Sequence, residues 1–171
     1  MMNLEKEYEK ALSMWEHKDT FGPAFYVFQK VAAELEDRST LTQSEQKMLI
    51  DCYAKMYLIP WSGRIKEEYE EYVDRMIEQM TSYVEKYPED VMVCDGCFFV
   101  MQAAYYYEEM YNWAIKLYKQ SGTARELGLK WLTSLIFLWD GILTQEEYDM
   151  YNQEYDQLVS EAKQSSPEQE E

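Results

Sequence analysis

The sequence predicts an all-α protein with about eight antiparallel helices, arranged in a bundle or a short helical-repeat array. Three observations lead to this fold class. Apolar residues recur every three or four positions along most of the 171 residues, which is the period of one helix face. The chain holds only 6 Gly and 4 Pro, too few for the many tight turns of an all-β protein. No stretch shows a convincing alternation of apolar and polar residues, the pattern of a half-buried strand.

Boundary signals place the ends of the helices. Pro23 suits the first turn of a helix, and Pro88 stops the fourth helix, whose apolar residues repeat most regularly. Thr42 and Glu45 form a capping box, in which each side chain satisfies a free backbone N–H at the start of the helix. Gly122 is expected to stop the sixth helix. The expected helices span residues 3–18, 23–36, 43–58, 65–87, 89–109, 111–121, 124–139 and 144–163.

The last two helices differ in character. Residues 124–139 are apolar nearly all round, which is typical of a helix in the middle of a bundle. Thr144 and Glu147 form a second capping box that opens the last helix. No shift in composition marks a second domain, so residues 1–163 are expected to form a single all-helical domain. The polar, acidic residues 164–171 are expected to be a disordered tail.

The charge balance restricts the kinds of partner. The chain has 33 acidic and 16 basic residues and a formal net charge of −17. Such a surface repels phosphate groups, so direct binding to nucleic acid or to an anionic membrane is not expected. The N-terminus shows no secretory signal, and the most apolar stretch, residues 131–143, is too short to span a membrane. Three cysteines, an odd number, suit a reducing compartment, so we expect the protein in the cytoplasm.

One segment resembles a known repeat family. Its aromatic and small residues are Phe98, Met101, Tyr105, Tyr111, Ala114, Tyr118 and Ser121. In this pattern, about 34 residues long, the segment is similar to a tetratricopeptide repeat. Gln102 stands where the family prefers Gly or Ala, and Glu126 stands where it prefers Pro. The resemblance implies a surface that binds a peptide or a protein, and a generic helical bundle is the alternative architecture.

One motif has the spacing for reactive chemistry. Cys94 and Cys97 could hold a metal or form a redox pair. A structural zinc site needs about four ligands, and the remaining candidates, Cys52 and His17, are far away in the sequence. Two buried structural cysteines, one helical turn apart, are the competing interpretation. We therefore expect no catalytic residues, no cofactor and no metal, and thiol chemistry is the only enzymatic alternative.

Two acidic helices and two tyrosines are the candidate partner-binding features. Residues 64–90 contain nine acidic and four basic residues, and residues 144–171 contain nine acidic residues and one basic residue. Tyr106 and Tyr107 do not fit the apolar stripes and are candidate exposed anchors. The candidate partner-binding residues are Glu67, Glu68, Glu70, Glu71, Tyr106, Tyr107, Glu146, Glu147 and Asp149.

Besides the thiol-chemistry alternative, the sequence leads to two non-enzymatic hypotheses about function. The first is a non-catalytic helical adaptor or regulator, which captures a basic or amphipathic segment of a partner protein through aromatic anchors and acidic rims. The second is an acidic nucleic-acid mimic that inhibits a DNA- or RNA-binding protein. Small acidic inhibitors of restriction and CRISPR nucleases, some of them phage-encoded, resemble this chain in composition and share no motif with it.

Overall fold

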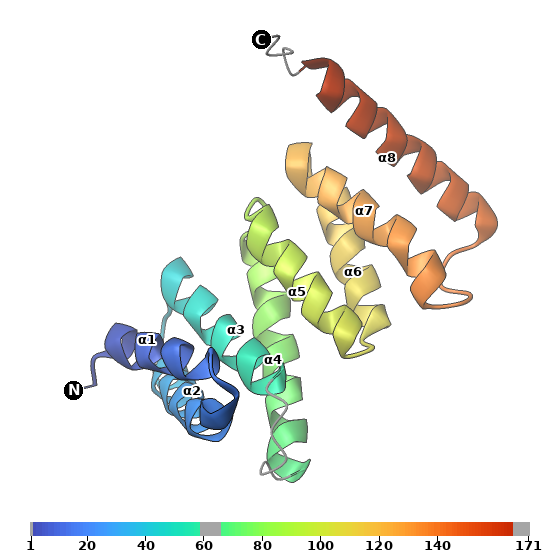
Figure 1. The fold of residues 1–171 in the computed structure, drawn as a ribbon. Helices are drawn as coiled ribbons and strands as arrows, with labels where there is room; N and C mark the ends of the chain where they lie inside the picture. The colour runs from blue at the N-terminus through green and yellow to red at the C-terminus, as the bar shows by residue number, and fades with distance from the viewer. Residues whose placement is uncertain (1, 59–65, 166–171) are drawn as a thin grey trace. The chain divides into compact units, whose positions relative to one another are not determined.

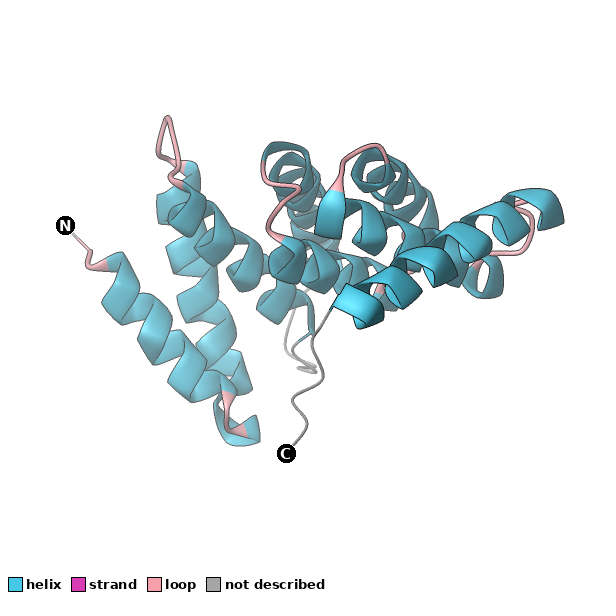
Figure 2. Ribbon diagram, turned by 90° about the horizontal axis from the view of Figure 1, so that it is seen from above, coloured by secondary structure: helices cyan, strands magenta, loops and turns pink. Residues whose placement is uncertain are grey.

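The computed structural model describes residues 2–58 and 66–165, with side chains from Glu71 onwards in the second range. Every regular element in these two ranges is a helix, as Figures 1 and 2 show. The all-α prediction is therefore confirmed. The helices are α1 (Leu4–Trp15), the 3₁₀ helix η1 (Lys18–Thr20), α2 (Phe21–Glu36), α3 (Gln43–Leu58), α4 (Lys66–Lys86), α5 (Val91–Ala103), α6 (Tyr107–Tyr118), α7 (Gly122–Leu138) and α8 (Gln145–Ser165).

The chain divides into two compact units, Met1–Tyr83 and Val84–Glu171. The first unit contains α1, α2, α3 and most of α4, and the second contains α5 to α8. A single domain over residues 1–163 stays a prediction. Helix α8 runs on to Ser165, so the first two residues of the expected tail are helical, and residues 166–171 lie outside the described part of the chain.

Both capping boxes form as the sequence predicts. The backbone N–H of Glu45 donates to the Thr42 hydroxyl at 3.3 Å, and the backbone N–H of Thr42 donates to the Glu45 carboxylate at 2.8 Å. The bonds from the Thr42 backbone and then from its hydroxyl lower the pKa of Glu45. The Thr144 and Glu147 pair repeats the arrangement, with distances of 3.1 and 2.8 Å. Short-range polar signals therefore set where α3 and α8 begin.

The predicted boundary between the fifth and sixth helices is wrong. Residues 97–109 contain neither glycine nor proline, but α5 ends at Ala103 because Tyr105 takes a left-handed conformation, with φ of 63°. The Tyr106 N–H donates to the Met101 carbonyl at 3.1 Å, and the Tyr105 N–H donates to the Gln102 carbonyl at 3.2 Å. This is the Schellman ending of a helix, in which the left-handed residue is usually glycine. A tyrosine in that position gives no sequence signal for a helix end.

The expected role of Gly122 is also corrected. It was predicted to stop the sixth helix, but α6 ends at Tyr118, and Gly122 is the first residue of α7. Its φ of 62° lies in the left-handed region, which glycine enters without steric cost. The glycine therefore makes the turn into α7 rather than the turn out of α6.

The core of the first unit lies among α2, α3 and α4. Phe25 and Phe28 of α2 are fully buried, as is Tyr53 of α3. Tyr72 of α4 packs edge-on against Phe25, with ring centroids 5.8 Å apart, and lies 6.3 Å from Tyr53. Helix α1 packs against α2. Large aromatic side chains therefore join three helices of this unit, where each buries a large apolar area.

Helix α7 is at the centre of the second unit. It packs against α5, α6 and α8, as its apolar character predicts. Trp131 of α7 stacks on Phe98 of α5 at 5.1 Å, and Phe98 meets the edge of Trp113 of α6 at 5.8 Å. All three side chains are buried. Among the described helices, none is long and apolar enough to cross a membrane.

Candidate functional site

Two hollows lie along α7 in the second unit, between α5 and α8. Figure 1 shows α7 between these two helices. Residues near the beginnings of α5 and α7 line one hollow and residues near their ends line another, so the two helices run parallel, and α8 runs antiparallel to them. We call the two hollows together the α7 groove.

The first hollow, here the Glu126 hollow, has a volume of about 320 Å³. It is lined by Val91, Met92 and Asp95 of α5, by Thr123, Glu126, Leu127 and Lys130 of α7, and by Tyr155 of α8. The second, here the Phe137 hollow, has a volume of about 380 Å³. It is lined by Gln102 of α5, by Trp131, Thr133, Ser134, Phe137 and Leu138 of α7, and by Tyr148 and Asn152 of α8.

The charges in the Glu126 hollow are unevenly paired. The Lys130 ammonium lies 3.0 Å from the Asp95 carboxylate, and the indole N–H of Trp131 donates to the same carboxylate at 2.8 Å. Glu126 is half-buried, and among the described residues its carboxylate has no ion pair and no hydrogen bond. The Glu126 carboxylate therefore lines the hollow without an ion pair of its own among the described residues.

Large apolar side chains stand exposed at both ends of the groove. Met92 is 82% exposed and Phe137 is 80% exposed. Phe137 meets the ring of Tyr148 edge-on at 6.0 Å, which leaves most of its own ring in water. Single exposed apolar residues are common on protein surfaces, but exposed aromatic and methionine side chains that rim a hollow are typical of interaction sites.

A polar cluster links α8, which lines one side of the groove, to α6 and α7. The Glu154 carboxylate of α8 accepts from the Arg125 Nε at 2.9 Å and from the Tyr118 hydroxyl at 3.0 Å. The Arg125 guanidinium also lies 4.4 Å from the centre of the Tyr118 ring. Burial and then the bond to Glu154 raise the pKa of Tyr118, so its hydroxyl stays a donor. Side chains of α6, α7 and α8 thus meet in one cluster.

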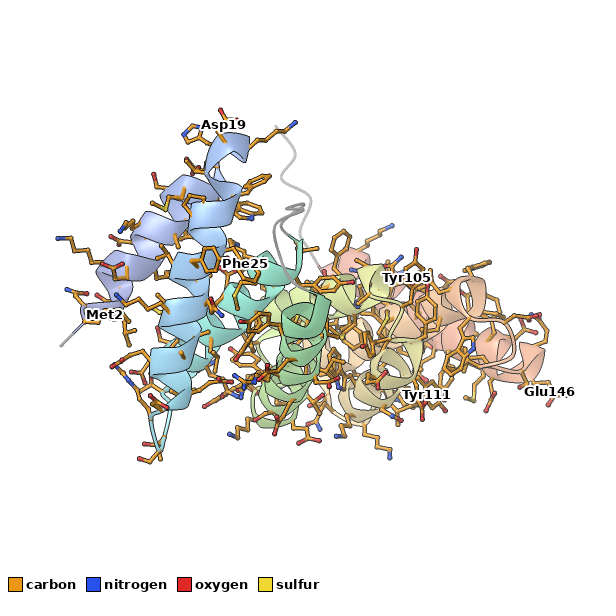
Figure 3. The ribbon with its side chains drawn as sticks, turned by 90° about the horizontal axis from the view of Figure 1, so that it is seen from below. Met2, Asp19, Phe25, Tyr105, Tyr111 and Glu146 are labelled. Atoms are coloured by element: carbon orange, nitrogen blue, oxygen red, sulfur yellow. The ribbon has the colours of Figure 1, made fainter. Side chains whose placement is uncertain are left out.

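The two predicted tyrosine anchors are half-buried. Tyr106 precedes α6, and Tyr107 packs near Tyr105 and Trp139, with ring centroids 6.1 and 6.4 Å away. The exposed tyrosine of this segment is Tyr105, at 78%, which Figure 3 labels. The strained turn that ends α5 exposes Tyr105 to solvent. The expected helix over residues 89–109 ran through this turn, so it could not predict that exposure.

The predicted acidic residues of α8 do not line either hollow of the α7 groove. Glu71 is exposed and pairs with Arg75. Glu146, labelled in Figure 3, and Asp149 are exposed on α8, while Glu147 caps that helix. The remaining three belong to α4, and their side chains lie outside the described part of the chain: Glu67, Glu68 and Glu70.

Sequence reasoning missed the residues that line the groove. Phe137 was included in an apolar run that was interpreted as a buried helix, and Glu126 was noted only as a departure from a repeat pattern. A signal was present, because one face of α7 carries most of its polar residues at helical spacing. That face consists of Thr123, Glu126, Lys130, Ser134 and Phe137.

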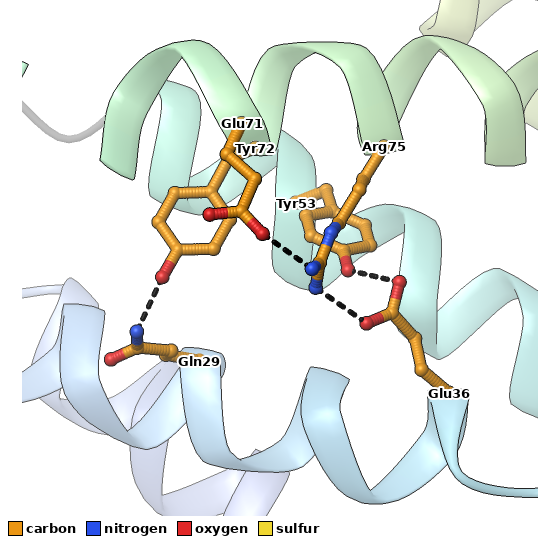
Figure 4. Close-up of polar contacts among 6 residues, drawn as sticks. All are labelled: Gln29, Glu36, Tyr53, Glu71, Tyr72 and Arg75. Atoms are coloured by element: carbon orange, nitrogen blue, oxygen red, sulfur yellow. Dashed lines mark hydrogen bonds and ion pairs between the residues drawn. The ribbon is translucent and has the colours of Figure 1, made fainter. Parts of the chain in front are cut away.

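A second polar cluster lies in the first unit and joins α2, α3 and α4 (Figure 4). The Glu36 carboxylate accepts from the Tyr53 hydroxyl and, at 2.9 Å, from Arg75, which also pairs with Glu71. Burial, followed by the bond to Glu36, raises the pKa of Tyr53. The cluster lines a cavity of about 290 Å³. Because its carboxylates already have hydrogen-bond donors, we interpret this cluster as a structural link that stabilises the packing of the three helices. Figure 4 draws Gln29, Glu36, Tyr53, Glu71, Tyr72 and Arg75.

The cysteines lie in environments that suppress thiol reactivity. Cys52, Cys94 and Cys97 are all buried and free. Burial, followed by the charge of Asp90, raises the pKa of Cys94 to about 12. Burial raises the pKa of Cys97 further, and the neighbouring Cys94 adds to the shift. The thiolate is the reactive form of cysteine, so this environment disfavours a nucleophile. Among the described residues, no three metal-binding side chains come together.

The thiols should react slowly in the folded protein. At pH 8 we expect an aromatic disulfide reagent to modify none of the three cysteines within minutes, and all three after the chain is unfolded in urea. The release of the coloured thiol measures both rates. Rapid modification of Cys94 or Cys97 in the folded protein would revive the thiol-chemistry alternative.

Comparisons with known proteins supplied no relative for this chain: no protein-family model matches it, nor does any curated protein or solved structure. The similarity to a tetratricopeptide repeat therefore stays a prediction.

Proposed function

We propose that the protein is a non-catalytic adaptor that holds a segment of a partner protein in the α7 groove. The observation that carries this proposal is the exposure of Met92 and Phe137 at the two ends of a hollowed surface. Covering these side chains removes apolar area from water, which is the main driving force of association. The buried Trp131 lines the Phe137 hollow, and a side chain that packing already holds in place adds little ordering cost on binding.

The charge of the second unit indicates the chemistry of the partner. Residues 84–171 contain 17 acidic and six basic residues. An excess of this size attracts a basic segment and speeds its association, while the apolar contacts hold the complex together. The proposed partner is therefore a basic or amphipathic segment of a protein.

A pair of matched variants tests the proposed function. Phe137→Asp removes an exposed anchor of the groove, and Met150→Asp makes the same kind of change at a half-exposed site of α8 that does not line it. In affinity capture from the source cells, we expect Phe137→Asp to weaken retention of the specific partner by about tenfold or more. Met150→Asp should retain it like the unaltered protein, and a high-salt wash should leave the complex intact.

An acidic mimic of nucleic acid is the second candidate function. It rests on the face of α8 that carries Glu146, Asp149 and Asp156, all exposed. In this case captured proteins would be basic nucleic-acid-binding proteins that high salt releases. Duplex DNA or RNA would compete for them, and Phe137→Asp would have no effect. Equal retention by both variants would thus contradict the groove and favour the mimic.

A further inference from the structure

We infer that the segment held in the α7 groove inserts a basic side chain, best an arginine, between Glu126 and Tyr155 and places an apolar side chain beside Phe137. This inference rests on the proposed function and adds which side chains the partner must carry. The two hollows differ in chemistry, and each one favours a different side chain of the partner.

The Glu126 hollow offers what a guanidinium group requires. The Glu126 carboxylate has no partner among the described residues, because the nearby Lys130 is already paired with Asp95 at 3.0 Å. Tyr155 adds an aromatic ring to the same hollow. A guanidinium can bind a carboxylate with two parallel N–H bonds and stack on an aromatic ring at the same time. Lysine can satisfy the charge but offers no planar group for stacking.

Other occupants fit this hollow less well. An anionic side chain would approach both Glu126 and Asp95, and the single cation Lys130 leaves the pair with a net negative charge. A purely apolar side chain would remove the Glu126 carboxylate from water without giving it a hydrogen bond, which costs free energy. A basic side chain avoids both costs.

The Phe137 hollow suits an apolar side chain. The exposed Phe137 ring and the Tyr148 ring meet edge-on at its rim, and the buried Trp131 lies at its floor. Most of its polar groups are neutral side chains, those of Gln102, Thr133, Ser134 and Asn152. An aliphatic or aromatic side chain placed there covers the exposed ring.

The distance between the hollows sets how far apart the basic and the apolar residue lie in the partner's segment. Glu126 and Phe137 are 11 positions apart on one helix, which corresponds to about 16 Å at 1.5 Å per residue. An extended segment covers this distance in about five residues. A helical segment needs about 11 residues, as α7 itself does.

A library of random 16-residue peptides, displayed on phage and selected against the full chain, tests the inference without knowledge of the partner. We expect the selected peptides to share an arginine and a large apolar residue at one of these two spacings. Their affinities for the protein and its variants are then measured by fluorescence anisotropy with synthetic labelled copies.

Two variants with the same change in charge provide the comparison. Glu126→Gln should weaken binding of the selected peptide by about tenfold, because it removes the carboxylate that pairs with the arginine. Glu146→Gln removes an exposed carboxylate that does not line the groove, and should change binding less than twofold. Replacing the peptide's arginine by lysine should weaken binding to the unaltered protein.

The outcomes separate this inference from the proposed function. Selected peptides that need Phe137 but lack a basic residue, or bind equally well to Glu126→Gln, would overturn the inference and leave the adaptor intact. Peptides that lose the same affinity with Glu126→Gln as with Glu146→Gln would show only a general attraction of the acidic protein for basic peptides. That result would overturn the specific site at Glu126. A selection without any peptide that depends on Glu126 or Phe137 would overturn both proposals.

Discussion

Replacing Gly128 with alanine is expected to lower the free energy of unfolding of the second unit by about 2 kcal/mol, because over-packing of a tight contact typically costs 1–3 kcal/mol. Gly128 lies in α7, where that helix crosses α6. A Cβ atom added there would lie 2.5 Å from the backbone nitrogen of Tyr118 and 2.7 Å from the carbonyl oxygen of Ala114. Both atoms belong to the backbone of α6, so relief requires the two helices to move apart.

Gly96 provides the matched control. It lies inside α5, and an added Cβ atom there would have nothing within 4 Å. Gly96→Ala should therefore stabilise the protein by up to about 1 kcal/mol, the difference between the two residues in a helix. Urea unfolding followed by circular dichroism measures both effects. Equal effects of the two substitutions would show that the close approach of α6 and α7 is not tight enough to exclude a methyl group.

The protein is expected to lose stability steeply as the pH rises above about 9. Burial, followed by the charge of Asp51, raises the pKa of Cys52, and burial raises the pKa values of Cys94 and Cys97. Above the ordinary thiol pKa, the unfolded chain loses these three protons while the folded chain keeps them. Unfolding then releases protons, so each thiol lowers the free energy of unfolding by about 1.4 kcal/mol per pH unit.

Two tyrosines add to this loss above pH 10. Burial, followed by hydrogen bonds to carboxylates, raises the pKa of Tyr8, which donates to Asp51, and of Tyr53, which donates to Glu36. As for the thiols, the free energy of unfolding falls as the pH rises. Stability from these groups is fully present below the pKa of the unfolded tyrosine and is lost as the pH rises toward the folded value.

Urea unfolding between pH 7.5 and 10.5, under reducing conditions, measures the effect. Cys52→Ala should reduce the slope of stability against pH above 9 by about 1.4 kcal/mol per pH unit. The slope is the informative quantity, since loss of the buried sulfur also lowers stability at neutral pH. A slope that stays unchanged in Cys52→Ala would mean that this thiol ionises equally easily in the folded and unfolded chain.

The sequence by itself determined the features that depend on neighbours three or four residues away. Helical spacing of apolar residues gave the fold class, because a helix aligns such residues on one face. Thr42 with Glu45, and Thr144 with Glu147, gave the starts of α3 and α8, because a capping box is completed within one turn. The apolar character of residues 124–139 also gave the central position of α7 in its unit.

Only the tertiary structure decided the features that depend on distant residues. Tyr105 ends α5 in a conformation that costs free energy for any residue with a side chain, and no local pattern indicates it. The α7 groove requires α5, α7 and α8 to lie side by side. The apolar pattern of one helix therefore could not show that Phe137 is exposed while Trp131, six residues before it, is buried. Whether a carboxylate such as Glu126 finds a cation depends on which helices meet, and that is a property of packing rather than of sequence spacing.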